Sequence, residues 1–492
     1  MGSSLVVGGR RQVGGVRKAN QERPRRVGTG YLTPRSTESR VSVTSCASMT
    51  KLLRSIGLVH ATALVVGIIV GASIFVQPAL VTSQVPSVAG VLLLWTTAGV
   101  LTLVGSLVIA ELASAFPKTG GVYVFLREAF SPPVGFLWGW AMFWTMHSGI
   151  IAVIAMVFAR YMASYLVLGE VGVRAVAIAA VLALSAVNYR GVRQGSVVQV
   201  VLTSVKVAAL LLIVAAAINI ARQGGGAFRL ESGAIVTALP SPRAFASALI
   251  AGLFAYGGWH MVSYAAEETV NPTRTIPRAL VAGTITVTAL YVCVNAAYLF
   301  VLPLRTVASS TRIAADFADA AVGGSGAHIL SALVVLSSLG AMNGVILAGP
   351  RVYLAMAEDG LLFKWVGVVH PVFRTPHKAI ALQAAWSAVL VATGTYRTLF
   401  TRVVYTEWIF FGLLAVALFV FRRRAGYAPA YRVWGYPVLP ALFACAAAVM
   451  VVNQLVREPA ESLTGLGFVL TGLPVYYLWS RRHSTPTLRP GL

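Results

Sequence analysis

Long apolar stretches, each long enough to cross a lipid bilayer, recur from Ile56 to near the end of the chain. A transmembrane helix needs about 20 consecutive, mostly apolar residues. Short polar segments separate the stretches, so the pattern predicts twelve spans, the fourth and ninth of them short, in an all-α polytopic membrane protein. We place the spans at about 56–83, 88–115, 133–168, 174–190, 196–221, 243–268, 277–303, 328–357, 379–395, 399–421, 436–453 and 463–480.

Two of the predicted helices contain stretches that weaken a helix. Gly257 and Gly258 are adjacent in the sixth span, and glycine is a poor helix former. Gly71, Ala72 and Ser73 lie near the middle of the first span. Inside a membrane, a break is tolerated where it is buried in protein or lines a cavity. Each stretch is therefore either a notch that lets another helix pack closely or a place where a polar solute binds.

The positions of the two stretches favour binding. They lie five spans apart, and paired interruptions at corresponding positions of two halves are typical of inverted-repeat transporters. The sequence therefore predicts that helices 1 and 6 cross near the bilayer midplane and hold the substrate between them.

Composition supports a membrane protein. Of 492 residues, 57% are hydrophobic and 11% are charged, whereas a soluble protein has about 25% charged residues. The net charge of +24 arises largely from basic residues in short loops, so membrane topology explains it better than nucleic-acid binding does. With the N-terminus inside, the cytoplasmic segments after residue 50 hold nineteen Lys and Arg and the outer segments nine. This bias predicts that both termini are cytoplasmic.

The first 50 residues differ from the rest of the chain. They hold nine Lys and Arg, only Glu22 and Glu38 as acids, and no apolar core of signal-peptide length. We interpret them as a disordered basic tail. The tail is a lipid-binding arm, a transit peptide or an upstream extension of a chain that starts at Met49. The permease domain is expected at 51–485, with a short tail at 486–492.

Several motifs resemble those of a known family. The sequence Gly-Ala-Ser-Ile-Phe at 71–75 is similar to the Gly-Ser-Gly-Ile-Phe signature of the amino acid–polyamine–organocation (APC) superfamily. Residues 254–259, with 267–268 and 271–272, resemble helix 6 of its L-type amino acid transporter family. The resemblance keeps its order over residues 51 to about 480. Further matches are 111–112, 117–121, Arg351 with 357–360, 370–371, 375–376, 407–408, 422–424 and 435–437.

The resemblance implies a LeuT-type fold, with helices 1–5 and 6–10 as inverted repeats, and an amino acid as cargo. Such a site needs no catalytic side chain, metal or cofactor. The backbone N–H groups of Gly71, Ala72 and Ser73, at a helix end, would bind the carboxylate. The ammonium group would be bound by backbone carbonyls, those of Ile69, Phe254, Ala255 and Gly257. The chain departs from the family at Ala72, where a serine is usual, and Ser73 either replaces that hydroxyl or tightens the site.

Some side chains near the breaks have open roles. Phe254 and Tyr256 are candidates for gating residues, because an aromatic ring beside unwound backbone can swing without breaking helical hydrogen bonds. His260 either contacts the cargo or is a hydrogen-bonded histidine of the bundle. His147 is expected to be packed in the bundle, and the sequence assigns no role to Glu407.

Acidic residues at the predicted cytoplasmic helix ends form either an inner gate or solvated caps. Their expected partners are nearby arginines. Glu111, Glu267 and Glu268 are the acids, and Arg127, Arg274 and Arg278 are the arginines.

Lys206 is the most unusual charged residue. It lies about 15 Å into helix 5, near the midplane, where a lysine costs on the order of 2.5–3.5 kcal/mol on insertion scales. It therefore needs oxygen partners, which we expect to be carbonyls near Gly71 and the hydroxyls of Ser337 or Ser338. The resemblance implies that its ammonium group replaces the sodium ion of sodium-coupled relatives of the fold. Transport is therefore predicted not to require sodium.

These features favour a secondary amino acid transporter of the plasma membrane, either an exchanger or a proton-linked uptake system. Helices 1 and 6 offer no acid at their breaks, which favours neutral L-amino acids over cationic amino acids or polyamines. A membrane enzyme and a non-transporting receptor are competing functions, and the sequence contains no motif of a membrane enzyme. Animal members of the family join a heavy chain through a cysteine between helices 3 and 4. Cys46, Cys293 and Cys445 lie elsewhere, so no disulfide-linked partner is expected.

Overall fold

The computed structural model describes one unit of the chain. The described residues are 52–482 without 164, 167, 227–240, 324–325, 396–397 and 399–401. The predicted tails at 1–50 and 486–492 lie outside the described residues.

Helices make up this unit. The first half contains α1 (Leu58–Ile69), η1 (Ala72–Phe75), α2 (Gln77–Gln84), α3 (Val88–Ala115), α4 (Val122–Ala129), α5 (Pro132–Ala141), η2 (Met142–Met146), α6 (His147–Met162), α7 (Glu170–Tyr189) and α8 (Val192–Arg222). The second half contains α10 (Pro242–Ala255), η4 (Trp259–Glu268), α11 (Pro272–Val301), α12 (Leu304–Ser309), α13 (Ile313–Val322), α14 (Gly326–Ala348), α15 (Pro350–Glu358), η5 (Lys364–Gly367), α16 (His377–Thr393), α18 (Thr406–Arg422), α19 (Val438–Arg457), α20 (Pro459–Leu470) and α21 (Gly472–Arg482).

Nine helices in the described part of the chain are long and apolar enough to cross a membrane. They match nine of the twelve predicted spans, which confirms a polytopic all-α protein. The other three predicted spans correspond to α1, α16 and α18, which are 12, 17 and 17 residues long. These three helices are shorter than the nine that are long enough to cross a membrane, so the number of twelve spans stays a prediction.

Some boundaries differ from the prediction. The third span was expected to reach residue 168, but α6 ends at Met162, and a π-helical turn, η2, precedes it at Met142–Met146. Such turns widen a helix and are frequent at functional sites. The seventh span begins at Pro272, five residues earlier than expected, because a proline fits the first turn of a helix.

Two helical segments are interrupted at the predicted small-residue stretches. The first helix stops at Ile69 and resumes as η1 at Ala72, and α10 stops at Ala255 before η4 begins at Trp259. Gly258 adopts φ +92°, a conformation that residues other than glycine rarely adopt. Glycine therefore makes the second interruption sterically possible.

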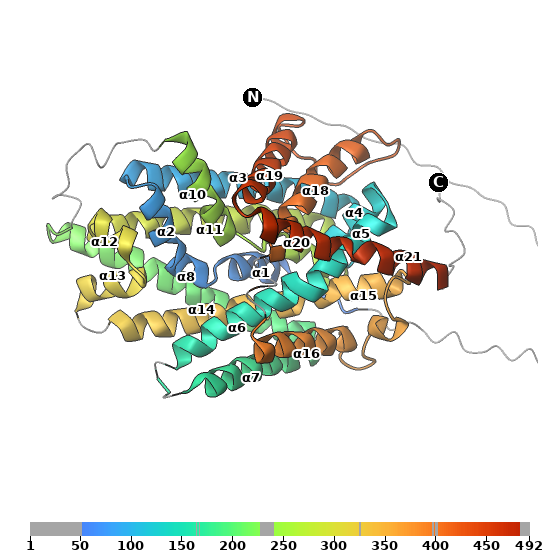
Figure 1. Cartoon of the computed structure of the whole chain (residues 1–492), viewed down its shortest axis with the longest axis horizontal. Helices are drawn as coiled ribbons and strands as arrows, with labels where there is room; N and C mark the ends of the chain where they lie inside the picture. The colour runs from blue at the N-terminus through green and yellow to red at the C-terminus, as the bar shows by residue number, and fades with distance from the viewer. Residues whose placement is uncertain are drawn as a thin grey trace, which may run out of the picture. The chain divides into compact units, whose positions relative to one another are not determined.

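The interrupted first helix is surrounded by other elements. It packs against α8, α11, α14 and η4, and in Figure 1 α1 lies in the middle of the bundle. Gly67 makes the contact with α8 possible, because a Cβ atom there would collide with the side chains of Gln199 and Thr203. The helix with the predicted binding stretch is thus in the interior of the bundle, where broken backbone can be shielded from lipid.

Candidate functional site

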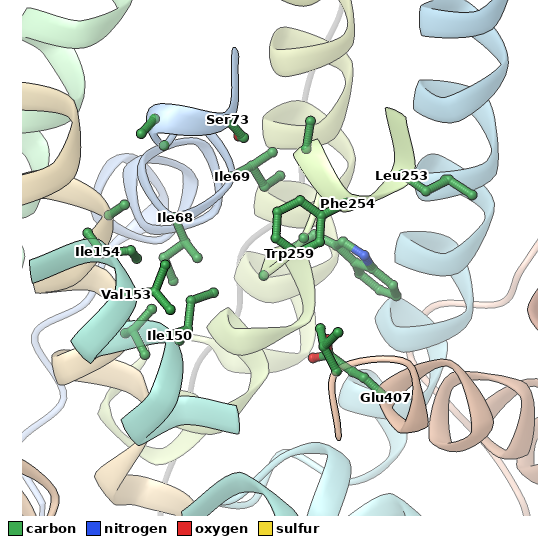
Figure 2. A pocket seen from close by; sticks show the side chains of 18 of the residues that line it. Ile68, Ile69, Ser73, Ile150, Val153, Ile154, Leu253, Phe254, Trp259 and Glu407 are labelled. Carbon is green, nitrogen blue, oxygen red and sulfur yellow. The ribbon is translucent and has the colours of Figure 1, made fainter. Parts of the chain in front are cut away.

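A cavity of about 460 Å³ lies where the two interruptions meet. This volume is in the range of small-molecule sites. Its wall contains both breaks together with side chains of α6, α14 and α18, several of which are labelled in Figure 2. Seven of the eight predicted substrate-binding residues line it, namely Ile69, Gly71, Ala72, Ser73, Phe254, Ala255 and Gly257.

The first break presents backbone N–H groups to the cavity. Ala72 and Ser73 are the first two residues of η1, and N–H groups at the start of a helix have no partner within it. The N–H of Gly71 differs from the prediction, because it donates to the carbonyl of Ile69 at 2.8 Å. The candidate anion site therefore consists of two N–H groups rather than three, with the side chain of Ser73 beside them.

The second break is a tight turn. The N–H of Tyr256 donates to the carbonyl of Leu253, and that of Gly257 donates to the carbonyl of Phe254, both at 3.1 Å. The carbonyl of Phe254 is thus already engaged by backbone. A carbonyl oxygen has two lone pairs, so this hydrogen bond leaves it one acceptor position.

Tyr291 of α11 joins the two breaks, a role that no feature of the sequence indicated. Its buried hydroxyl lies 3.0 Å from the carbonyl oxygen of Ile69 and 3.2 Å from that of Ala255. These are two of the four carbonyls predicted to bind the ammonium group. A hydroxyl has one proton to donate, so it can serve only one of them at a time, and the carbonyl of Ile69 also accepts from the N–H of Gly71.

Lys206 holds the first break from the other side. Its Nζ atom donates to the carbonyls of Gly67 and Val70, each at 2.7 Å. Ser337 donates to the same Val70 oxygen at 3.2 Å. The hydroxyl of Ser338 is buried and has no hydrogen-bond partner among the described residues. Lys206 and Ser337 thus both donate to the carbonyl of Val70, and Ser338 does not take part in this network.

Two further residues of α8 extend this contact. Thr203 donates to the carbonyl of Ala63 at 3.0 Å, and Gln199 lies 3.5 Å from the same oxygen. Gln199 and Thr203 are four residues apart, and Thr203 and Lys206 are three residues apart. At this spacing the three side chains lie on one face of α8. That spacing was visible in the sequence, but the sequence does not say which helix the face contacts.

The aromatic residues of the second break have different positions. Phe254 is 46% exposed and lines the cavity, as Figure 2 shows, and this position fits a gate. Tyr256 is fully buried, and its hydroxyl donates to the carbonyl of Trp95 at 3.1 Å. It lies behind the break and does not line the cavity, which does not fit the predicted gating role.

Of the two positions that the sequence left open for His260, the structure shows the one inside the bundle, although neither ring nitrogen has a hydrogen-bond partner among the described residues. Its side chain is fully buried and is not part of the cavity wall. The 3₁₀ segment η4, which begins just after Gly258, directs it toward α18, where its Nε2 atom lies 3.6 Å from Oε1 of Glu407. A direct contact with the cargo is therefore replaced by a contact with a carboxylate that faces the cavity.

Glu407 is a wall residue that the sequence did not identify. It lies in the first turn of α18, and Figure 2 shows it across the cavity from Ser73. Among the described residues of the wall, it is the only acid, and none is Lys or Arg. The absence of an acid at the breaks of helices 1 and 6 therefore did not exclude an acid from the site.

The cavity extends from the breaks along α6. Its wall follows that helix from His147 to Tyr161, about 21 Å at 1.5 Å per residue. On the other side of the breaks, the buried side chains of Arg351 and Glu268 form two hydrogen bonds of 2.7 and 2.9 Å. The carbonyl of Glu268 also binds the N–H of Ile56, just before α1. These contacts join η4 to α15 and to the segment just before α1.

The ion pairs at the predicted cytoplasmic helix ends differ from those expected. Glu268 pairs with Arg351 rather than with Arg274 or Arg278, and Glu111 pairs with Arg422 at 2.6 Å. Arg127 contacts Asp359 and Glu128. The expected partners were near in sequence, whereas the partners of Glu268, Glu111 and, in Asp359, of Arg127 lie far along the chain.

Comparisons with known proteins identify the family of the chain. The amino acid permease family model matches residues 56–478. The serine/threonine exchanger SteT of Bacillus subtilis (strain 168) is 32% identical over 443 residues, which are 88% of this chain and 98% of the exchanger. The human b(0,+)-type amino acid transporter 1 is 29% identical over 451 residues, 89% of this chain and 91% of that protein.

A third relative is the rat large neutral amino acids transporter small subunit 2. It is 32% identical over 436 residues, which are 87% of this chain and 81% of that protein. The match of the family model to nearly the whole permease domain, together with these relatives, shows that the chain belongs to the amino acid permease family.

Proposed function

We propose that this protein is a secondary transporter of neutral L-amino acids that works by exchange and does not require sodium. The observation that carries the proposal is the cavity between two interrupted helices, in a chain of the amino acid permease family. The names of the relatives, an exchanger of serine and threonine and transporters of amino acids, support this cargo. The proposal involves no catalytic residue or cofactor.

The cargo would bind with its two charged groups at the breaks. Its carboxylate fits the N–H groups of Ala72 and Ser73, at the start of η1, where the helix dipole favours an anion. Its ammonium group fits the carbonyls of Ile69 and Ala255, which share the single proton of Tyr291. The side chain would then lie in the apolar part of the cavity along α6.

The finer architecture is part of the proposal. We expect twelve spans arranged as two inverted repeats of five plus two, with both termini cytoplasmic and the protein in the plasma membrane. In this orientation the cavity faces outward, and the pair Arg351–Glu268 lies on the inner side. No disulfide-linked partner is expected, since the segment between α6 and α7 has no cysteine.

A cationic amino acid or polyamine permease is the second candidate. Glu407 favours it, because a carboxylate in the wall could pair with a cationic side chain. The same carboxylate lies beside His260, which can balance its charge. Competition by lysine and arginine against leucine and threonine separates the two candidates.

The transport activity can be tested by solute counterflow. Proteoliposomes loaded with an unlabelled neutral amino acid should transiently accumulate the labelled one from outside, and replacing sodium by choline should not change the rate. A receptor binds label but does not accumulate it. Absence of counterflow with every amino acid of a broad panel would contradict the proposal.

Gly71→Leu tests the anion site. A Cβ atom at Gly71 meets nothing closer than Ala341 at 3.8 Å, so a larger side chain would extend into the cavity rather than into protein. A ligand at 100 times its Kd stabilises a protein by about 2.7 kcal/mol, and we expect Gly71→Leu to lose this thermal stabilisation. Gly71→Ala is the control that should keep it. Normal stabilisation of the leucine variant would place the anion site elsewhere.

Phe254→Ala tests the gate. Without the ring, the second break has no aromatic cover over the cargo, and we expect transport to be abolished while the protein still reaches the membrane. Phe363→Ala is the control, since Phe363 is 51% exposed and lies outside the cavity wall. Counterflow rates, normalised to protein in the membrane, are the measurement. Unchanged uptake would refute the gating role.

Lys206→Ala tests the support of the first break. It removes two hydrogen bonds from a charged donor, each contributing about 1.5–3 kcal/mol, so counterflow should fall at least about tenfold. Gly340→Ala should also slow transport with the lysine in place, because its added methyl group would lie 2.6 Å from Cε of Lys206. Lys364→Ala, at an exposed lysine, is the control. A fully active Lys206→Ala variant would contradict this role.

A further inference from the structure

A group of polar side chains lies at and behind the cavity wall, next to the second break. His260 of η4 packs against Trp138 of α5 and Tyr264, with ring centroids 5.8 and 5.6 Å apart. His147, at the start of α6, packs against Tyr264 at 5.6 Å. All four side chains are buried, so two histidines lie in one cluster in the interior of a membrane protein.

The histidines are not satisfied by hydrogen bonds. Neither ring nitrogen of His260 has a hydrogen-bond partner among the described residues, and the same holds for Nε2 of His147. Buried polar groups without partners cost free energy and call for an explanation. Ionisable groups inside membrane bundles are costly and mark ion or proton pathways.

Glu407 connects His260 to the cavity. Its Oε1 atom lies 3.6 Å from Nε2 of His260, and its side chain is 16% exposed while that of His260 is fully buried. The carboxylate can therefore exchange protons with water in the cavity, and the imidazole behind it can share them. A neutral imidazole has one nitrogen that accepts a proton, and an ionised carboxylate is an acceptor only.

Within the described part of the chain, no other group balances the charge of the pair formed by Glu407 and His260. The titratable groups that face it are His147, Tyr264 and, beyond His147, Tyr353, whose hydroxyl lies 3.2 Å from Nδ1 of His147. The nearby charged residues of other elements are engaged elsewhere: Arg351 binds Glu268, and Lys206 binds carbonyls of α1.

Cargo binding and proton binding should then favour each other. The cavity wall is largely apolar and includes Trp408, Phe411 and Phe443. A bound amino acid displaces water from this wall, which raises the cost of an unneutralised carboxylate. If bound cargo strengthens proton binding, the bound proton strengthens cargo binding by the same factor.

We propose that Glu407 and His260 form a proton-binding site through which net amino acid uptake is coupled to one proton. The proposal rests on the proposed transport function and adds net uptake to exchange. A proton from the outer solution binds to the Glu407 carboxylate, shared with His260, while cargo occupies the cavity. After the cavity opens inward, the same proton and the cargo leave to the inner solution, and the pair returns to its starting state.

The test is steady-state accumulation in sodium-free proteoliposomes without internal amino acid. The interior is one pH unit more alkaline, and valinomycin with equal potassium holds the membrane potential at zero. One proton per cargo then supports an accumulation of up to about tenfold. A protonophore should abolish it. Because accumulation is a thermodynamic ratio, it distinguishes lost coupling from slower transport.

Glu407→Gln should bring the accumulation ratio to about one, even if counterflow is also slower. His260→Gln is the second variant, and its accumulation ratio should also be about one. It tests the proton site if Glu407→Gln does not reach the membrane. His328→Gln, at a histidine outside the cavity wall, is the control and should accumulate like the unaltered protein.

The outcomes separate the two proposals. If the unaltered protein shows counterflow but no accumulation, the proton site is refuted and the transport function stands. If Glu407→Gln or His260→Gln accumulates cargo as well as the unaltered protein, the pair is not the coupling site. If no counterflow occurs at all, the transport function fails, and the proton site fails with it.

Discussion

The structure depends on how the backbone is satisfied where two buried helices are interrupted. In a membrane interior, water does not supply hydrogen bonds to freed carbonyls, so protein side chains must do so. Here Lys206 and Ser337 bind the carbonyls of the first break, and the hydroxyl of Tyr291 lies within reach of one carbonyl from each break. Without these donors the interruptions would be too costly, and without the interruptions no polar site would exist at this depth.

The same arrangement leaves capacity for a ligand. Tyr291 has one proton for two carbonyls, and the N–H groups that begin η1 have no partner within the helix. An amino acid carries three ammonium protons and a carboxylate, which complement these groups. The apolar wall along α6 then receives the side chain, and Glu407 adds one ionisable group across the cavity from Ser73 (Figure 2).

The sequence predicted features that depend on local properties. Adjacent glycines and small residues located both breaks, and the cost of a charge at mid-membrane located Lys206 and its carbonyl partners near Gly71. Features that depend on the pairing of distant helices were missed, as with Tyr291, Glu407 and the partners of Glu268 and Glu111. Tyr256 was misplaced and the role of His260 stayed open, because the turn at the second break, where Gly258 has φ +92°, sets the direction of the side chains around it. Sequence spacing gives no measure of that rotation.

The central claim is that the cargo binds to the backbone of both breaks, with its charged groups at the positions described. An experimentally determined structure of the protein with a transported amino acid tests this most directly. We predict the carboxylate within hydrogen-bonding distance of the N–H groups of Ala72 and Ser73, and the ammonium group at the carbonyls that Tyr291 now contacts. Cargo bound elsewhere in the bundle, with both breaks unchanged and uncontacted, would contradict the account.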